Sequence, residues 1–233
     1  MPYLKFISDK NLISAVSKVI NVIEKAEQDA EVNIHKNVID PFSALFHGIT
    51  KSIPYTDWME QEKARQTQKT MQNSIGDFHQ DILGSISGWK NLGTGGGLDV
   101  INKKMKIIAE VKNKYNTTKG NHLVKLYDDI KNTLKNYEYT GYTGYYVEVI
   151  SKRRKKYDKP FTPSEKGKRR PAKNKIRVID GVSFYEMATG RKNALLELFD
   201  IIPQVIADKH NYKLNKQESK EYHKLFKMAF STE

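Results

Sequence analysis

Three charged residues stand within two short apolar runs near the middle of the chain. Asp99 lies in GLDVIN, and Glu110 and Lys112 lie in KMKIIAEVKN. If both runs are strands of a buried sheet, each charge is costly to desolvate unless a partner or a metal compensates. This placement predicts a functional site. The alternative is a surface hairpin whose charges face water.

The three side chains suit metal-assisted chemistry. Residues two apart on a strand point to the same face, so Glu110 and Lys112 project together, and Asp99 on a neighbouring strand can reach them. Two converging carboxylates repel unless a divalent cation lies between them, and oxygen-only ligation suits Mg²⁺. The Val111 carbonyl is a further candidate ligand. Lys112 can orient or deprotonate a water, or stabilise charge in a transition state.

The surrounding pattern predicts the elements that hold these residues. The two apolar runs are joined by the turn residues 102–104, which predicts an antiparallel hairpin. Hydrophobic periodicity predicts helices over 11–33, 41–49, 59–86, 122–137, 183–190 and 192–209. Strands are expected over 141–151 and 176–181. Turn residues predict a loop over 51–58 and a glycine-rich turn over 87–97. Pro203 is expected to interrupt the last helix. The order predicts a mixed α/β fold, a sheet flanked by helices, with added N- and C-terminal helices.

Composition narrows the class of partner. The 233 residues suit a single domain, with a helical part over 1–50 and a basic arm over 151–175. Lysine and arginine outnumber aspartate and glutamate by 40 to 27, a net charge of +13, which favours a nucleic acid partner. There is no cysteine, so disulfides and thiolate metal sites are excluded. No secretory signal is apparent and no apolar run approaches the ~18 residues that span a bilayer, so a cytoplasmic protein is expected.

Several motifs resemble a known enzyme family. LDV, followed eleven residues after Asp99 by the glutamate of AEVK, resembles the PD-(D/E)xK nuclease signature, with Leu98 where proline often stands. The stretches NSIGDFHQDILG, EVKNKYNTTKG and IDGVSFYEMATG extend the similarity over about residues 53–190. The chain thereby resembles a bacterial type II restriction endonuclease, and more narrowly the group that cuts the interrupted palindrome GGNCC.

The resemblance carries specific expectations. It implies a restriction-endonuclease-like fold in which Asp99 and Glu110 hold Mg²⁺ and Lys112 completes the catalytic set for hydrolysis of double-stranded DNA, leaving 5′-phosphate ends. Superfamily members often add an acidic residue from a helix beside the sheet, and the candidates are Asp77, His79 and Gln80. His79 could equally be a polar residue beside an apolar stripe. A companion DNA methyltransferase is expected in the same restriction-modification system, but not as a stable partner.

Two stretches are expected to contact DNA. Five polar residues follow the catalytic strand, namely Asn113, Lys114, Asn116, Thr117 and Lys119, and the basic arm adds Arg153, Arg154, Lys155, Lys168, Arg169, Arg170 and Lys173. The arm is expected to be a loop that orders on DNA and contacts guanine as well as phosphate. The alternative is a solvated charge run. A palindromic target favours a homodimer, for which the N-terminal helix and the helix 195–206 are candidate surfaces if they are not core.

Two other functions remain open at this point. A structure-specific nuclease for DNA repair or recombination would use the same three residues and ignore sequence. A non-catalytic DNA-binding protein would leave Asp99, Glu110 and Lys112 scattered, more than ~10 Å apart, because shared metal ligation requires closer approach.

Overall fold

The computed structural model describes residues 2–34, 39–93, 97–117, 120–210 and 214–230. The chain forms two compact units. Met1–Val16 and His79–Glu233 form the first, called here the sheet unit, and Ser17–Phe78 form the second, called the helical unit.

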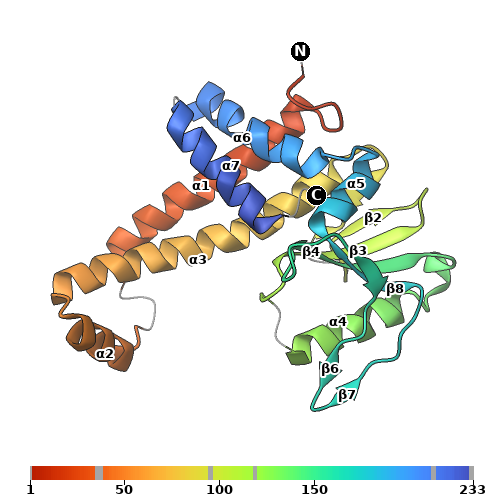
Figure 1. The fold of residues 1–233 in the computed structure, drawn as a ribbon, viewed down its shortest axis with the longest axis horizontal. Helices are drawn as coiled ribbons and strands as arrows, with labels where there is room; N and C mark the ends of the chain where they lie inside the picture. The colour runs from red at the N-terminus through yellow and green to blue at the C-terminus, as the bar shows by residue number, and fades with distance from the viewer. Residues whose placement is uncertain (1, 35–38, 94–96, 118–119, 211–213, 231–233) are drawn as a thin grey trace. The chain divides into compact units, whose positions relative to one another are not determined.

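Helices come first in the chain, followed by the antiparallel hairpin, a further helix, further strands and the last helices, broadly as the sequence predicts (Figure 1). The helices are α1 (Asp9–Asn33), α2 (Pro41–Lys51), α3 (Tyr55–Gly84), α4 (Gly120–Thr133), the 3₁₀ helix η3 (Tyr137–Tyr139), α5 (Gly181–Thr189), α6 (Ala194–His210) and α7 (Lys216–Ala229). The strands are β1 (Trp89–Asn91), β2 (Val100–Asn102), β3 (Ile107–Lys114), β4 (Thr143–Ile150), β5 (Asp158–Pro160), β6 (Ser164–Glu165), β7 (Lys168–Arg169) and β8 (Ile176–Asp180). The predicted fold class is confirmed.

Six strands form one mixed sheet in the order β1-β2-β3-β4-β8-β5. The predicted hairpin is confirmed, since β2 and β3 pair antiparallel with Ile101 opposite Ile108. Strands β3, β4 and β8 are parallel to one another, and β5 pairs antiparallel with β8 at the edge. Strands β6 and β7 form a separate two-stranded hairpin.

Helices cover both faces of the sheet. On one face, Tyr127 and Ile130 of α4 join a buried cluster with Ile108, Tyr146 and Ile176 of the strands. On the other face, Phe184 of α5 packs against Trp89 and Tyr145, with ring centroids 5.3 Å and 6.0 Å apart. Each buried side chain of this size contributes about 2 kcal/mol through the hydrophobic effect, so the central strands are fixed from both sides.

The helical unit consists of α2 and most of α1 and α3. Helices α1 and α3 lie side by side, and Lys63 Nζ lies 3.1 Å from Glu31 Oε2 between them (Figure 1). The Asp40 side chain accepts hydrogen bonds from the backbone N–H groups of Phe42 and Ser43, which caps α2. In the part of the chain that the structure describes, no helix has both the length and the apolar character needed to cross a membrane.

Four sequence expectations about elements are wrong. The loop expected over 51–58 ends early, because α3 begins at Tyr55 directly after Pro54, a residue suited to a helix start. Pro203 does not interrupt the last predicted helix but lies inside α6. The glycine-rich turn contains β1, and the arm contains β5, β6 and β7 rather than a loop throughout. The helix α7, which the analysis of the sequence does not predict, follows α6.

The helix 195–206, considered as a dimer surface, belongs to the core. Its residues Leu195, Leu198 and Val205 are all buried, as are Leu12 and Val16 of the N-terminal helix. These side chains are therefore occupied within the chain.

The backbone of Val149 packs closely against Gly181. A Cβ added there would lie 2.5 Å from the Val149 carbonyl oxygen and 2.7 Å from its Cα. We expect Gly181→Ala to lower the free energy of unfolding by about 2–3 kcal/mol, because backbone must move. Apart from the two chain neighbours and the backbone of α3 itself, no described atom lies within 4 Å of a Cβ added at Gly76, so Gly76→Ala should raise the free energy of unfolding by up to about 1 kcal/mol. Urea denaturation measures both changes, and a Gly181→Ala protein with an unchanged free energy of unfolding would contradict this packing.

Candidate active site

The start of β2 holds Asp99 against β3 at two points. The Asp99 backbone N–H donates to the Ala109 carbonyl over 2.9 Å, and the Val111 N–H donates to Asp99 Oδ2 over 2.7 Å. These two contacts lie on either side of Glu110 in the chain. The Asp99 carboxylate is therefore fixed next to Glu110, as the hairpin predicts.

Glu110 and Lys112 meet on the same face of β3. Lys112 Nζ lies 2.6 Å from Glu110 Oε1, and their side chains are 35% and 16% exposed. The structure thus brings together Asp99, Glu110 and Lys112, which the non-catalytic reading expects to be scattered. Two carboxylates and a lysine therefore lie together, half-buried, near the carboxyl end of β3.

The neighbouring parallel strand adds an acidic residue that the sequence analysis does not single out. Glu110 pairs in register with Tyr146, and Lys112 pairs with Glu148 of β4. Paired residues of neighbouring strands project from the same face, so Glu148 lies on the face of Lys112. Ligand sites in α/β sheets characteristically lie at the carboxyl ends of parallel strands, where these residues stand. The only local signal was a single glutamate within a valine- and tyrosine-rich strand.

Tyr157 ties the basic segment 152–156 to this edge. Its hydroxyl donates a hydrogen bond to Glu148, and its backbone N–H donates to Asp180 Oδ2 over 2.6 Å. Burial raises the pKa of Tyr157, and the Glu148 hydrogen bond raises it further, so the phenol stays protonated. Arg153, Arg154 and Lys155 stand just before Tyr157 in the chain. The hydrogen bond from Tyr157 to Glu148 therefore keeps this cationic turn near the carboxyl end of β4.

The residues present fit a hard divalent cation. Asp99 and Glu110 could supply carboxylate oxygens to it, and Val111, between Glu110 and Lys112, could supply a carbonyl. Among the described residues, no group of three or more His, Cys, Asp or Glu side chains is arranged to hold a metal. A site with two carboxylates falls below that number, yet Mg²⁺ is usually bound by one or two carboxylates with waters completing its shell.

The three helix candidates have different surroundings. Asp77 is exposed and belongs to the helical unit, and Gln80 is half-buried in the sheet unit. His79 is buried, with Nδ1 2.8 Å from the Tyr185 hydroxyl. That environment favours a structural role for His79. The structure instead places Asp81 of α3 against β1, where it accepts a hydrogen bond from Asn91 Nδ2 over 2.9 Å.

The residues expected to contact DNA fall into three groups. Asn113 and Lys114 are half-buried at the end of β3, and Asn116 and Thr117 are exposed beyond it, while Lys119 lies outside the described residues. Arg153, Arg154 and Lys155 are exposed in the turn before β5. Lys168 and Arg169 are exposed on β7, and Lys173 is exposed just beyond it.

Arg170 differs from these because it is paired. Its guanidinium binds Asp128 of α4 through two hydrogen bonds, Nη2 to Oδ2 over 2.6 Å and Nε to Oδ1 over 3.2 Å. The Tyr127 hydroxyl also donates to the Pro171 carbonyl over 2.8 Å. The β6–β7 hairpin is therefore attached to α4, and Arg169 extends from an anchored element.

Burial of His79 predicts a pH-dependent stability. Burial lowers the pKa of His79 from 6.5 to about 4. Between those values the unfolded chain binds a proton that the folded chain does not, so the free energy of unfolding falls as the pH falls, by up to about 3 kcal/mol in total. Urea denaturation from pH 7.5 to 4.5 should show a steeper decline for the wild type than for His79→Gln. Equal slopes would contradict a buried neutral imidazole.

Comparison with known proteins shows the family to which this chain belongs. The family model described as Eco47II restriction endonuclease matches residues 4–211. The type II restriction enzyme Eco47II of Escherichia coli is 42% identical over 210 residues, which cover 88% of this chain and 87% of the relative. The type II restriction enzyme Sau96I of Staphylococcus aureus is 30% identical over 212 residues, covering 88% and 80%. The mixed sheet flanked by helices is consistent with a restriction-endonuclease-like fold. The chain therefore belongs to the Eco47II restriction endonuclease family and is a type II restriction endonuclease.

Proposed function

We propose that this enzyme hydrolyses double-stranded DNA in the presence of Mg²⁺ at a short palindrome of the GGNCC type, in the bacterial cytoplasm. A separate methyltransferase would protect the host DNA. The observation that carries the proposal is the placement of Asp99, Glu110 and Lys112 at one edge of the sheet. Membership of the restriction endonuclease family and the net charge of +13 support DNA as the substrate.

Asp99 and Glu110 would hold the metal, with the Val111 carbonyl as a third ligand. When bound, Mg²⁺ supplies positive charge to the transition state and activates water. The protein contributes the positions of the ligands. The Val111 N–H fixes one oxygen of Asp99, and Lys112 fixes one oxygen of Glu110.

Lys112 is the residue of the set that does not ligate metal. Its ammonium group, held at Glu110, can orient the attacking water and offset the negative charge that grows on the phosphate. The water oxygen loses a proton to solvent and forms a bond to phosphorus, the bond from phosphorus to the 3′ oxygen breaks, and the 3′ oxygen takes up a proton from solvent. The products are a 5′-phosphate and a 3′-hydroxyl.

DNA would be held by the cations around this edge. The turn at 152–156 is tethered through Tyr157, and the β6–β7 hairpin is tethered through Arg170. Phosphate contacts from these elements would position the duplex, and base contacts would choose the site. Because each chain offers one such site, two chains related by a two-fold axis are the simplest arrangement for cutting both strands of a palindrome.

Incubation with phage DNA, with Mg²⁺ or with EDTA, tests the proposed function. We expect discrete fragments only with Mg²⁺, and sequenced ends that share one palindrome. Cleavage restricted to branched DNA would instead identify a structure-specific nuclease. Intact DNA that is retarded on a gel would leave only a DNA-binding protein.

A further inference from the structure

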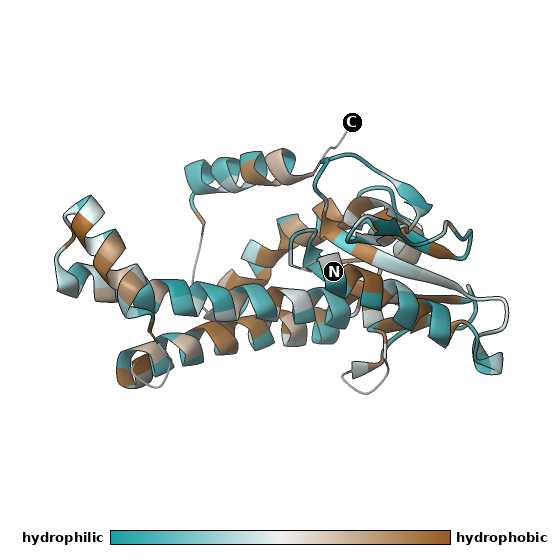
Figure 2. Cartoon of the chain, turned by 90° about the horizontal axis from the view of Figure 1, so that it is seen from below, coloured by the Kyte–Doolittle hydropathy of each residue, from teal (hydrophilic) through white to brown (hydrophobic). Residues whose placement is uncertain are grey.

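Helix α2 exposes a row of large apolar side chains. Phe42 is 70% exposed, Leu45 56%, Phe46 67% and Ile49 69%, and Tyr55 at the start of α3 is 70% exposed. We call these five residues the α2 surface. No residue described on α2 is buried, and Figure 2 shows hydrophobic colour along the helix.

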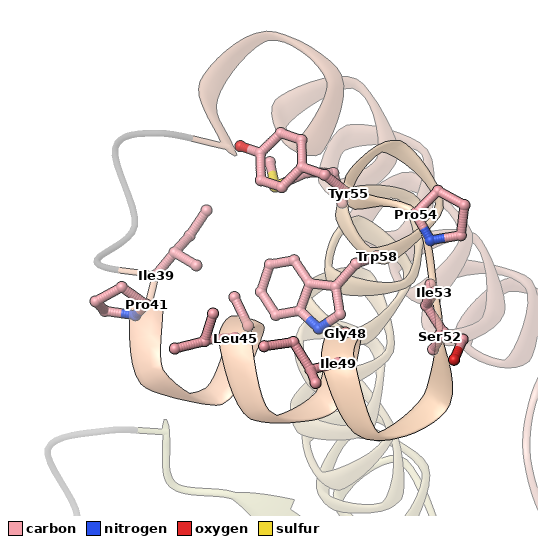
Figure 3. A pocket seen from close by; sticks show the side chains of 12 residues that line it. Ile39, Pro41, Leu45, Gly48, Ile49, Ser52, Ile53, Pro54, Tyr55 and Trp58 are labelled. Carbon is pink, nitrogen blue, oxygen red and sulfur yellow. The ribbon is translucent and has the colours of Figure 1, made fainter.

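A groove accompanies this surface. It has a volume of about 760 Å³ and lies between α2 and the first turns of α3 (Figure 3). Leu45 and Ile49 line it from α2, and Tyr55 and Trp58 line it from α3. The exposed rings of Phe42 and Phe46 belong to the same helix but do not line the groove. The helical unit thus presents aromatic side chains and an apolar groove next to each other.

We propose that the α2 surface is the interface with a second copy of this chain. A two-fold contact makes each partner supply the same patch, so Phe42 and Phe46 of each copy would enter the groove of the other. This inference rests on the proposed function in one respect, because two chains are the simplest means of cutting both strands of a palindrome.

The exposed area is close to what such an interface needs. Three aromatic side chains of about 200 Å² each, exposed by about two thirds, and two aliphatic ones give on the order of 600 Å², against about 800 Å² per partner in a stable interface. Contiguous apolar patches above a few hundred Å² are uncommon on monomeric proteins. The patch is therefore large enough to anchor a dimer whose rim is polar.

Charge is divided between the two units in a way that favours this contact. Residues 17–78 contain seven lysines and arginines and nine aspartates and glutamates, a net charge of −2, while the rest of the chain contains 33 and 18, a net charge of +15. Two copies would repel through their basic units. Contact through the helical unit avoids that repulsion and leaves the basic units for DNA.

The same charges weigh against other occupants. A nucleic acid would meet a unit with a slightly negative charge and a helix whose one charged residue is Lys51. A lipid surface is usually bound by helices with several lysines or arginines on the polar face. A second copy requires neither feature.

The mass of the free protein in solution tests the proposal. Sedimentation equilibrium at micromolar concentration, without DNA or metal, should give twice the chain mass of 26.9 kDa. Phe46→Glu should raise the dissociation constant at least about 30-fold, as expected when an aromatic anchor is removed from an interface. Tyr137→Glu is the matched control, because Tyr137 is 83% exposed in the sheet unit, and it should remain dimeric. All three proteins should melt at similar temperatures.

Other results would overturn the proposal. A monomeric wild type, or a Phe46→Glu protein as dimeric as the wild type, would remove the α2 surface from the interface. If a monomeric wild type bound vesicles of mixed neutral and anionic phospholipid and Phe46→Glu did not, the surface would be a membrane contact instead. Failure of the proposed function is distinguishable, because the mass is measured without cleavage. A dimer that cut no DNA would refute that function while supporting this interface.

Discussion

Replacing Glu110 with glutamine should lower the rate of DNA cleavage by at least about 10³-fold, because charge stabilisation worth several kcal/mol depends on its carboxylate. Glutamine keeps the shape of the side chain but cannot balance a divalent cation or Lys112. The ion pair at 2.6 Å would also be lost. Single-turnover cleavage of a plasmid with saturating enzyme measures the effect on the chemical step.

A matched substitution separates chemistry from folding. Glu138→Gln removes the same charge from an exposed residue of η3 and should cut DNA at the wild-type rate. Glu110→Gln should still bind DNA, since its charge change does not reduce the number of cations. If Glu110→Gln cleaved within about tenfold of Glu138→Gln, the carboxylate would not belong to the catalytic machinery.

Arg169 and Arg170 should behave differently although they are adjacent. Arg169 is exposed on β7, so Arg169→Ala should lower binding to the target by about 10- to 100-fold if it contacts guanine, and lower nonspecific binding much less. Arg170 anchors the hairpin to Asp128, so Arg170→Ala should weaken target and nonspecific binding by similar factors. Competition binding with target and scrambled duplexes at one salt concentration measures both ratios.

Asp128→Asn tests the anchoring role of Arg170 from the other side. It removes the same ion pair but keeps the Arg170 cation. The ratio of target to nonspecific binding should therefore change as little as it does in Arg170→Ala. A larger loss of specificity in Arg170→Ala than in Asp128→Asn would show that Arg170 contacts bases itself. Equal losses of target and nonspecific binding in Arg169→Ala would show that Arg169 on β7 contacts phosphate and not bases.

The β2–β3 hairpin is predictable because its signals are local. Alternation of apolar and charged residues around Glu110 and turn residues before it were enough to predict β2 and β3. The helix α4 followed from its own periodicity. Asp99 could be placed near Glu110 because antiparallel neighbours in a hairpin are close in sequence.

The features that the sequence does not predict depend on contacts between residues that are far apart in the chain. Glu148 lies beside Lys112 only through the parallel register of β3 and β4, which no local pattern encodes. The three residues of β1 depend on pairing with β2. Strand β5 ends at Pro160, which a strand tolerates at the edge of a sheet but which reads as a loop signal in the sequence. The sequence gives no sign that Arg170 differs from the other cations of the arm, because its partner Asp128 lies 42 residues away.

The position of the metal tests the account most directly. Crystals grown or soaked with Mn²⁺ in place of Mg²⁺ should show one anomalous peak within about 2.0–2.3 Å of oxygens from Asp99, Glu110 and Val111, with Lys112 outside the coordination shell. The peak should disappear in Glu110→Gln crystals. A peak between Glu148 and Asp180 instead, or one that persists in Glu110→Gln, would contradict the assignment of the active site to the β2–β3 hairpin.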